Sequence, residues 1–488
     1  MIEPGLEEVK ELAGRYDIVP VKEEIFADVV TPILLLRKIA KSKKHYFLLE
    51  SVEGEEKWGR YSFLGYDPVI RVTCREHAVV IDRKGKKKTI ETEDGMQVLR
   101  DILSELKAPR LEGMPPFAGG FVGYFAYAML AHAEPKLSIK RGEFADYDVM
   151  LFDRVIAYDH LKQKIIIVAN VGTGGKIEED YAKAQADIKG IVSMVRDDSP
   201  LPEEDVYDKV HFSCKVTDWQ YAEMVEKAKQ YIYQGDIFQA VLSRRFVSDY
   251  EGSLIHPYRV LRTTNPSPYM VYMNMGDMEI MSTSPETLVR LSDGRLVTFP
   301  VAGSRPRGKD EAEDETLVKD LLADEKELAE HNMLVDLGRN DLGRISKYGS
   351  VEVTKYKMIH KYSKIMHICS QVEGDISDKY DALDAIQSVL PAGTLSGAPK
   401  IRACEIIDEL EAEPRGIYGG ALGYIDFSGN MDTCIAIRMA VKKDNKVYVQ
   451  AGGGIVADSR PDMEYKESGN KARAVMLAIE RAKEAVEP

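Results

Sequence analysis

The stretch from Leu321 to Ile345 constrains the fold most, because it combines a helical pattern with carboxylates on the side expected to be buried. Leu, Ala, Glu and Lys dominate its first part, which predicts a helix. Glu327 and Glu330 lie three residues apart, so on a helix they share one face. Glu330 also lies on the face of Leu334 and Leu337, where an apolar stripe would run. A carboxylate there needs a partner such as a divalent cation, whereas the simpler interpretation is a solvated acidic face.

A second helix-forming stretch repeats this spacing near the C-terminus. DMEYKESGNKARAVMLAIERAKEA follows Pro461, and its apolar residues recur at helical spacing. Glu464 and Glu467 are again three residues apart, and Lys471 lies one turn beyond Glu467. Two such helices could bring their carboxylates around one or two metal ions. Mg²⁺ usually takes only one or two carboxylates and leaves room for water and substrate oxygens, so the pattern favours a site for an anionic substrate.

Length and charge limit the classes of protein that need to be considered. A chain of 488 residues predicts two domains, or one large domain with an elaborated half. Apolar residues make up 44% and charged residues 30% of the chain, as in soluble globular proteins. The net charge of −14 argues against a nucleic-acid-binding protein, which would carry a basic face. It does not exclude an anionic substrate, because a metal ion and a few local cations can reverse the field inside a pocket.

The cysteine pattern and the N-terminus both favour a cytoplasmic protein. The cysteines form no CxxC pair and are odd in number, which argues against a disulfide framework or a zinc site; they are Cys74, Cys214, Cys369, Cys404 and Cys434. The N-terminal stretch MIEPGLEEVKELAGRYDIVP is acidic and lacks the apolar core of a signal peptide. No apolar run is long enough to span a bilayer, so we expect no membrane contact.

Strand signals dominate residues 21–170, where short apolar or alternating runs are separated by Gly, Asp and Pro. No βαβ alternation is sustained, so a doubly wound parallel sheet is not expected. The stretch RDDSPLPEEDVY combines charge, Pro and Ser and predicts a linker, and a strong helix follows from Thr217 to Gln234. We therefore expect an α+β fold with mixed or antiparallel β-sheets and helices packed outside, divided into residues 1–205 and 206–488.

Glycine-rich segments and a lone arginine in the second half suit an anionic ligand. LPAGTLSGAPKIRACEIIDEL combines a loop containing Gly393 and Thr394 with a helix start that suits a carboxylate or phosphate, although an ordinary capped helix explains it equally well. It is not a P-loop, because the GKS or GKT ending is absent. The glycines Gly452–Gly454 let a backbone approach a ligand closely, or simply form a bulge. Arg438 lies in an otherwise apolar predicted strand, CIAIRMA, and needs an anion from the protein or a ligand.

Residue type alone leaves the roles of two further polar residues open. His367 lies in the apolar stretch KIMHICSQVEG, where a structural histidine is commoner than one that transfers a proton. Glu286, in STSPETLVR, fits a turn or cap residue as well as a buried acid.

Together these stretches resemble the chorismate-utilising enzymes and, among them, the large subunits of anthranilate synthases. The resemblance rests on an ordered set of motifs from Gly235 to Ala472: GDIFQAVLSRRF, SPETLV, PVAGSRPRG, ELAEHNMLVDLGRNDLGRI, PAGTLSGAPKIRA, IYGGALGY, AGGGIVADS and EYKESGNKA. Shorter matches are LLES at Leu48 to Ser51 and NPSPYM at Asn265 to Met270. The resemblance implies sheets that form a sandwich, an N-terminal domain for tryptophan binding and partner contact, and a C-terminal catalytic domain that binds chorismate.

The resemblance also implies roles for residues at matching positions. The Mg²⁺ ligands would be Glu330 and Glu467, with Glu327 and Glu464 close behind. The substrate would be bound by Gly393, Thr394, Tyr418, Arg438, Gly452, Gly453, Gly454 and Lys471. Glu286 would help the ring hydroxyl leave, His367 would transfer a proton and assist loss of pyruvate, and Gln239 and Thr394 would complete the catalytic set. This agrees with elementary chemistry, since Mg²⁺ and N–H groups neutralise a dianion and a carboxylic acid protonates a poor leaving group.

Two positions distinguish members of the family. Members that add water carry Lys where this chain has Gln239, and those that make aminodeoxychorismate typically carry Lys where this chain has Ala302. Both positions favour addition of ammonia followed by aromatisation to anthranilate, the first step of tryptophan biosynthesis. Ser304 departs from the more usual Thr but keeps the hydroxyl. The alternatives are aminodeoxychorismate synthase and a catalytically silent, ligand-binding subunit, and the intact carboxylate pairs and His367 argue against the latter.

A partner subunit and an inhibitor follow from the same resemblance. No cysteine lies in a GxCxG nucleophile elbow, so ammonia from glutamine would come from a separate glutamine amidotransferase subunit. Feedback inhibition by tryptophan would involve Glu50, Ser51, Pro268, Tyr269 and Met270, which offer polar groups and an apolar slot. LLES also fits the end of an ordinary core strand.

Overall fold

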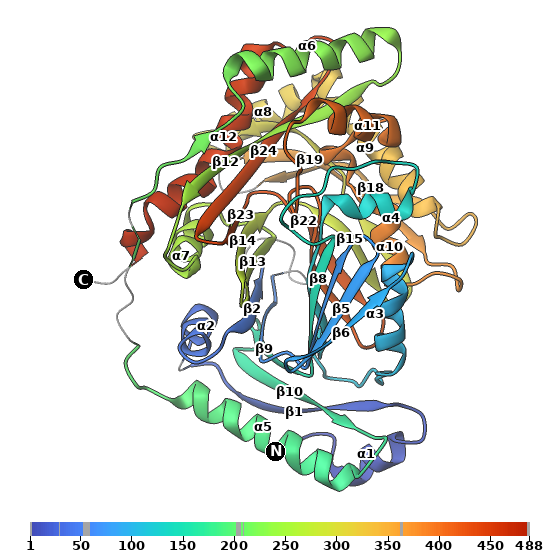
Figure 1. Ribbon diagram of the computed structural model, residues 1–488, viewed down its shortest axis with the longest axis vertical. Coiled ribbons are helices and arrows are strands. Elements are labelled where there is room, and N and C mark those ends of the chain that lie inside the picture. The colour runs from blue at the N-terminus through green and yellow to red at the C-terminus, as the bar shows by residue number, and fades with distance from the viewer. Residues whose placement is uncertain are drawn as a thin grey trace.

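The computed structural model describes residues 2–28, 30–51, 59–201, 206–207, 209–361 and 365–485. Within these ranges the chain forms two large antiparallel β-sheets, each of 12 strands, with helices outside them (Figure 1). The predicted α+β class with antiparallel sheets and outer helices is therefore confirmed.

Sheet A follows the order β1 (Ile18–Phe26), β10 (Lys164–Gly172), β9 (Arg154–Asp159), β3 (Tyr61–Tyr66), β2 (His45–Glu50), β13 (Tyr269–Met275), β14 (Met278–Ser284), β23 (Met439–Lys443), β24 (Lys446–Ile455), β12 (Gln239–Asp249) and β11 (Ser213–Cys214). The short strand β20 (Gly397–Ala398) also pairs with β12.

Sheet B follows the order β17 (Val301–Pro306), β19 (Ile365–Asp375), β16 (Arg295–Thr298), β15 (Thr287–Ser292), β22 (Met431–Ile435), β21 (Ala421–Asp426), β7 (Gly120–Phe125), β8 (Tyr147–Phe152), β4 (Ile70–Arg75), β5 (Ala78–Arg83) and β6 (Lys86–Glu91). Its remaining strand, β18 (Glu352–Lys361), pairs with β19. The basic run at Arg83–Lys88 spans the turn of the β5–β6 hairpin.

The helices of the described ranges are α1 (Leu6–Leu12), α2 (Pro32–Ala40), α3 (Gly95–Ser104), α4 (Leu130–Ala133), α5 (Ile177–Arg196), α6 (Asp218–Gln234), α7 (Ile255–Thr264), α8 (Glu311–Ala323), α9 (Glu325–Gly343), α10 (Ala382–Val389), α11 (Lys400–Leu410) and α12 (Pro461–Glu480). Short 3₁₀ turns are η1 (Tyr127–Met129), η2 (Gly393–Leu395) and η3 (Ala482–Ala485). None of the helices in the described ranges has both the length and the apolar character needed to cross a membrane.

Local sequence signals explain where the main helices begin and end. Thr217 and Gln220 form a capping box at the start of α6, and Gly235 ends that helix with φ of 85°. Pro461 begins α12. The helix predicted for the first part of Leu321–Ile345 is present but is interrupted near its start, because Asp324 separates α8 from α9. Its side chain accepts from the amides of Lys326 and Glu327, which starts a new helix.

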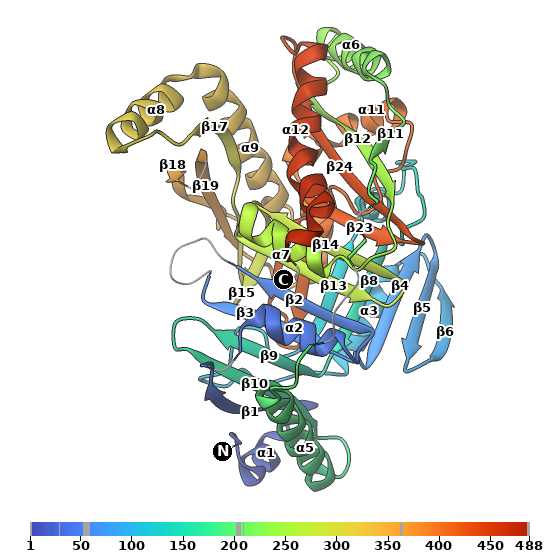
Figure 2. The same ribbon diagram turned by 90° about the vertical axis from the view of Figure 1, so that its left-hand side faces the viewer.

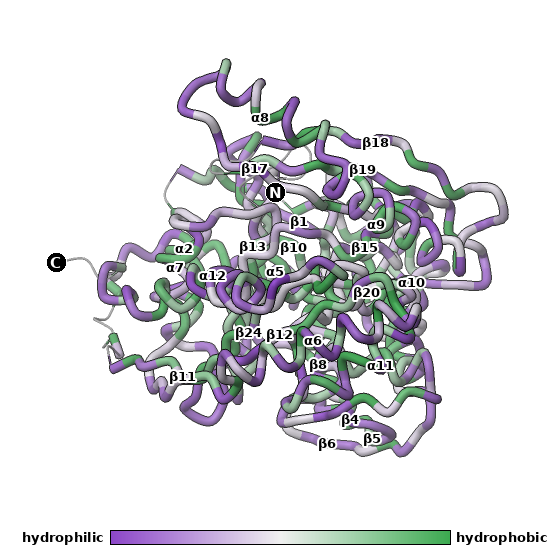
Figure 3. Tube along the Cα trace, turned by 90° about the horizontal axis from the view of Figure 1, so that it is seen from above, coloured by the Kyte–Doolittle hydropathy of each residue, from purple (hydrophilic) through white to green (hydrophobic). Residues whose placement is uncertain are grey.

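Three apolar clusters define four layers. Between the sheets, the cluster includes Phe47 and Phe63 of sheet A and Tyr124 and Phe152 of sheet B. The other face of sheet A packs against α2, α5, α7 and α12, and the other face of sheet B packs against α3 and α10. Figure 1 shows α5 below β1 and β10, and α6 and α12 above β12 and β24. In Figure 3 the hydrophilic trace lies mainly at the periphery, for example along α8 and β6.

Both sheets combine strands from the two halves of the sequence. In sheet A, β2 pairs with β13, so Glu50 lies opposite Met270. In sheet B, β7 pairs with β21. The chain crosses between the sheets directly after β14 and again after β22. The assignment of separate roles to residues 1–205 and 206–488 stays a prediction.

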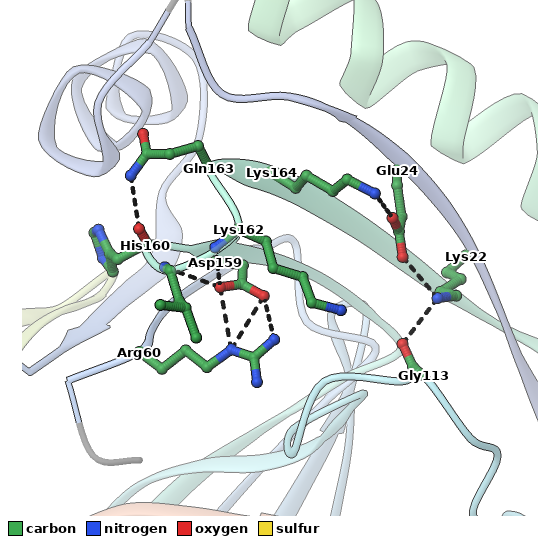
Figure 4. Close-up of polar contacts among 10 residues, drawn as sticks. Lys22, Glu24, Arg60, Gly113, Asp159, His160, Lys162, Gln163 and Lys164 are labelled. Carbon is green, nitrogen blue, oxygen red and sulfur yellow. Dashed lines mark hydrogen bonds and ion pairs between the residues drawn. The ribbon is translucent and has the colours of Figure 1, made fainter. Parts of the chain in front are cut away.

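Charged side chains stabilise the outer edge of sheet A (Figure 4). Glu24 of β1 accepts from Lys22 at 2.8 Å and from Lys164 of β10 at 2.6 Å, and these ammonium groups lower its pKa to about 2. Arg60 donates to Asp159, whose carboxylate also accepts the amides of Leu161 and Lys162 in the following turn. The edge strands are therefore joined by ion pairs as well as backbone bonds.

Phe47→Ala should lower the free energy of unfolding by about 3–5 kcal/mol, because it leaves a cavity between the sheets. Phe47 is fully buried and its ring centroid lies 4.8 Å from that of Phe152. Urea unfolding measures the change. Phe26→Ala is the matched control, because Phe26 is 75% exposed and its loss should cost less than about 0.5 kcal/mol. Equal effects of the two substitutions would contradict the layered packing.

Candidate active site

Two adjacent crossings between the sheets carry a glutamate and an arginine that the sequence analysis singled out. Glu286 lies in the step from β14 to β15, and Arg438 in the step from β22 to β23. Backbone hydrogen bonds join the crossings: the Ile435 amide donates to the Glu286 carbonyl at 3.0 Å, and the Thr283 amide to the Arg438 carbonyl at 3.1 Å. Arg438 was predicted within a strand, but it occupies a break with φ of 49°, because the chain changes sheets there.

Glu286 is held by Thr394 in a partly buried position. The Thr394 hydroxyl donates to both carboxylate oxygens, at 3.1 and 3.2 Å. Burial raises the pKa of Glu286 to about 8, while the Thr394 hydroxyl opposes this shift. Glu286 therefore retains its proton at neutral pH and can act as an acid.

Arg438 and Tyr418 form a polar pair without a carboxylate. No acidic side chain of the described residues lies within ion-pair distance of the Arg438 guanidinium, and burial lowers its pKa. Burial raises the pKa of Tyr418 to about 12, while the charges of Arg415 and Arg438 and the Gly452 amide oppose this shift. A partly buried guanidinium without a carboxylate suits an anionic ligand.

His367 of β19 lies near the same guanidinium. Its Nδ1 lies 3.1 Å from the Gly303 carbonyl. Burial and the charge of Arg438 lower the pKa of His367, so the ring is neutral at pH 7 and can accept a proton.

The glycines of β24 open space toward α12 and β12. A Cβ at Gly453 would lie 3.1 Å from Glu464 Oε2, and a Cβ at Gly454 would lie 2.1 Å from Gln239 Nε2. Side chains at these positions would fill the region between β24, Gln239 and the glutamates. Lys471 of α12 donates to the Gly452 carbonyl at 3.2 Å and pairs with Glu467 at 2.7 Å. The backbone of β24 at these glycines can therefore come close to a ligand.

The predicted carboxylate pairs lie on two helices that flank the upper half of the molecule, α9 with β17–β19 on one side and α12 with β12 and β24 on the other (Figure 2). Gln239 Nε2 donates to Glu330 Oε1 at 3.5 Å, which links α9 to β12. Burial and the charge of Glu330 raise the pKa of Glu327. Burial raises the pKa of Glu464. The Ser459 hydroxyl opposes this shift, and the charge of Glu467 adds to it.

These donors fit a hard divalent cation, because all are carboxylate oxygens and each pair carries like charges that a cation would relieve. The four glutamates are less tightly gathered than a tetrahedral cluster. In the described part of the chain, only Cys74, His132 and Asp146 bring three ligand atoms within 4.8 Å of one another. The assignment of these glutamates to a metal site stays a prediction.

The structure also shows contacts of these groups that the sequence analysis did not identify. Arg305, within the motif PVAGSRPRG, lies 3.5 Å from Glu327 and binds Asp320 and Asp324. Lys326 contributes a charge near Glu464. Lys400 pairs with Asp341 of α9. Motif matching could have singled out Arg305, but pairs such as Lys400 and Asp341 depend on contacts between distant segments.

Comparison with known proteins identifies the family to which the chain belongs. A family model described as chorismate binding enzyme matches residues 45–477. The chain belongs to the chorismate-binding enzymes. It is 46% identical to anthranilate synthase component 1 of Acetivibrio thermocellus, covering 99% of this chain and 100% of the relative, and 44% identical to that of Aquifex aeolicus, covering 99% of each. The predicted resemblance to the anthranilate synthase large subunits is confirmed, and this chorismate-binding protein is an enzyme.

Solved structures give the same result. Anthranilate synthase component I from Streptococcus pneumoniae is 36% identical, with a TM-score of 0.78 over 93% of this chain and 99% of that chain. The menaquinone-specific isochorismate synthase from Escherichia coli is 18% identical, with a TM-score of 0.72 over 97% of this chain and 98% of that chain, which shows the shared fold alone.

The residues predicted to bind an inhibitor lie at the ends of two neighbouring strands of sheet A in this chorismate-binding enzyme. Glu50, at the end of β2, lies opposite Met270 of β13. Its carboxylate accepts from Arg262 at 2.9 Å and from Tyr258 at 2.8 Å. The Tyr269 hydroxyl contacts Thr287 at 2.9 Å and donates to Asp432 at 2.8 Å. Ser51 and Pro268 are the neighbours of these strand ends in the sequence. The Glu50 and Tyr269 side chains point to opposite faces of sheet A, Glu50 toward α7 and Tyr269 toward sheet B, and their role in inhibitor binding stays a prediction.

Replacing Thr394 by Val should raise the pKa of Glu286 further, because the hydroxyl that favours its carboxylate form is lost. Infrared titration of the carboxyl band, with Glu286→Gln as the reference, measures this pKa. The folded state binds the Glu286 proton more tightly than the unfolded chain does, so this proton stabilises the fold at low pH. The free energy of unfolding of the wild type should therefore fall, relative to that of Glu286→Gln, as the pH rises toward about 8. A carboxylate already ionised at pH 6 would contradict the assignment.

Proposed function

We propose that this chain is the large subunit of an anthranilate synthase, which converts chorismate and ammonia into anthranilate and pyruvate. The observation that carries the proposal is the pair of adjacent crossings: one carries a protonated Glu286, and the other carries an Arg438 guanidinium that pairs with no carboxylate of the described residues. Full-length similarity to relatives named anthranilate synthase component 1 supports this choice within the family.

The substrate carboxylates would be bound by cations and backbone groups around β24. Arg438, Lys471 and the region of Gly452–Gly454 supply charge and close backbone approach. Tyr418 places its hydroxyl near the Gly452 amide and Arg438. These groups replace the water that a dianion loses on entering the site.

The shifted pKa values of Glu286 and His367 support a role in proton transfer for each residue. Glu286 holds a proton at neutral pH and would donate it to the departing ring hydroxyl, with the carboxylate then stabilised by Thr394. His367 is neutral and would accept a proton as the ring becomes aromatic and pyruvate leaves. Gln239 carries no charge, which is consistent with ammonia rather than an activated water as the nucleophile.

Glu330 and Glu467 would hold Mg²⁺, with Glu327 and Glu464 near them. The ion, when bound, would supply positive charge to the substrate carboxylate and help to orient it. Arg305 and Lys471 limit the repulsion among these glutamates in its absence.

Ammonia would come from a glutamine amidotransferase subunit. All five cysteines lie in the described ranges, and four of them are buried. Burial raises the pKa of Cys74, Cys369 and Cys434 to about 12, which suppresses the thiolate that a glutaminase needs. The proposed setting is the cytoplasm.

The direct test is to incubate purified chain with chorismate and Mg²⁺ and to follow anthranilate fluorescence. Ammonium should support turnover, and activity should rise with the NH₃ fraction, whereas glutamine alone should not. Aminodeoxychorismate as the product would favour the sister activity, and no turnover would favour a silent binding subunit. Glutamine-dependent turnover without a partner would show that the chain has its own glutaminase.

Glu330→Gln and Glu467→Gln should each lower turnover by at least about 100-fold and weaken Mg²⁺ binding, because each removes a proposed ligand. Isothermal titration with Mg²⁺ gives the binding constant, and anthranilate fluorescence gives the rate. Glu325→Gln on α9 and Glu480→Gln on α12 are matched controls on exposed faces of the same helices. Near-normal Mg²⁺ affinity and turnover in either ligand variant would rule out the assignment.

Tryptophan should raise the KM for chorismate by roughly 5–150-fold, and Ser51→Leu should remove this effect while leaving basal activity intact, because leucine would fill the slot. The proposal rests on the β2–β13 pairing, which brings Glu50 opposite Met270. The effect is reciprocal, so chorismate should weaken tryptophan binding by the same factor. Chorismate kinetics with and without tryptophan provide the measurement; a wild type that ignores tryptophan, or a variant inhibited equally, would overturn this proposal.

A further inference from the structure

Asp341 and Lys400 form an ion pair that is almost completely removed from water. Their side chains are 9% and 8% exposed. Lys400 Nζ donates to both Asp341 carboxylate oxygens at 2.7 Å and to the Val389 carbonyl at 3.0 Å. All three ammonium donors are therefore used. Burying such a pair costs about as much solvation free energy as the attraction between the charges returns, so its presence points to a positional role.

The three partners belong to the elements that surround the proposed acid. Asp341 lies near the end of α9, Val389 ends α10 and Lys400 begins α11. Between Val389 and Lys400 runs the loop Leu390–Pro399, which contains Thr394. Lys400 thus joins both ends of this loop and fastens them to α9.

Additional contacts connect the loop to α9. The Ser388 hydroxyl donates to the Asp341 carbonyl. A Cβ at Gly393 would lie 2.3 Å from Leu337 Cδ2 and 3.2 Å from Leu334 Cδ2, so the loop packs against α9 without room for a side chain. The position of α9 therefore limits the position of Thr394.

A small cavity lies where these elements meet Glu286. Its lining includes Glu286, Leu337, Asp341, Val389 and Thr394. The groups that face Glu286 are the Thr394 hydroxyl of η2 and the Cys369 thiol of β19, which is neutral because burial raises its pKa to about 12. Asp341 adds a charge to the cavity wall that Lys400 compensates.

We propose that the Asp341–Lys400 ion pair is a positioning pair, which fixes the loop Leu390–Pro399 to α9 so that the Thr394 hydroxyl meets Glu286. This inference rests on the proposed function and adds to it two residues that touch neither substrate nor metal. The pair acts through Thr394 and through the register of α9, which also carries Glu327 and Glu330.

Lys400→Met and Asp341→Asn should each lower kcat by roughly 100-fold, since a displacement of about 1 Å near the reacting groups can have this effect. The KM for chorismate should change by a smaller factor than kcat, because Arg438, Lys471 and the glycines of β24 lie outside this loop. The high-pH limb of kcat, measured at constant NH₃, should move to higher pH. Glu286 acts in its protonated form, so losing the Thr394 contact raises the pH at which activity disappears.

Together the variants distinguish an effect on the position of Thr394 from an effect of charge near Glu286 and from a loss of folding stability. Lys400→Met leaves an uncompensated carboxylate in the cavity wall, whereas Asp341→Asn does not. A shift of the high-pH limb of kcat that both variants share therefore reports a change in the position of Thr394 and not a change in charge. Thr394→Val supplies the direct reference. Asp148→Asn is the matched control, because it breaks the buried Arg71–Asp148 pair of sheet B, whose side chains are 20% and 2% exposed. It should lower the unfolding temperature without changing kcat or the pH limb.

The inference is overturned if Lys400→Met and Asp341→Asn lose stability like Asp148→Asn but keep wild-type kcat and pH limb. Should both fail to fold, Ser388→Ala removes only the second link to Asp341 and should show a smaller shift in the same direction; wild-type behaviour there would also overturn it. Infrared titration of Glu286 keeps this test separate from the proposed function. Its pKa should rise in Lys400→Met and Asp341→Asn whatever product the wild type forms, and an unchanged pKa would refute the positioning role.

Discussion

The site depends on the chain crossing from one sheet to the other at two neighbouring places. The crossings after β14 and β22 are joined by backbone hydrogen bonds, so Glu286 and Arg438 are held by main chain as well as side chains. Strands of both sheets restrict these bonds on either side. The helices with the glutamates, the β24 glycines and the Thr394 loop are then arranged around this rigid centre, where small displacements are costly.

Few of the charged groups in the site are neutralised by a direct ion pair, and this determines the electrostatic potential there. The chain carries a net charge of −14, yet the centre holds a guanidinium without a carboxylate and a carboxyl group that keeps its proton. At its edge, Glu327 lies near Glu330 on α9 and Glu464 lies near Glu467 on α12. The charges of Arg305, Lys326 and Lys471 offset part of the repulsion within these pairs. The dianionic substrate that we propose would therefore meet positive charge at the centre, and the proposed cation would meet negative charge at the rim.

Local signals in the sequence were sufficient for much of the secondary structure. The capping box of α6, the proline that begins α12 and the β5–β6 hairpin all depend on residues within a few positions of one another. The break at Asp324 was missed because α8 and α9 have the same helix-forming composition, and the cap becomes evident only from its hydrogen bonds. Arg438 was placed in a strand because an apolar run does not reveal where a chain changes sheets.

Most candidate residues were found through ordered motifs, whereas their physical coupling required the structure. Helical spacing predicted the two glutamate pairs, but only the three-dimensional arrangement shows Gln239 linking Glu330 to β12. Asp341 and Lys400 are 59 residues apart, and nothing in the composition of either segment indicates that they meet. Contacts of this kind depend on register and packing between distant elements, which a single sequence specifies only through the whole fold.

The mixing of strands from both halves also affects how the protein is made. As the chain leaves the ribosome, β2 and β7 are complete long before β13 and β21, the strands that cover their edges, have been synthesised. Uncovered edges invite pairing with other chains, and contacts between distant segments form slowly. The edges of β2 and β7 in a nascent chain therefore stay without these partner strands until the second half of the chain has been synthesised. During that interval, chaperone binding and the rate of translation would affect yield more than the stability of the finished enzyme.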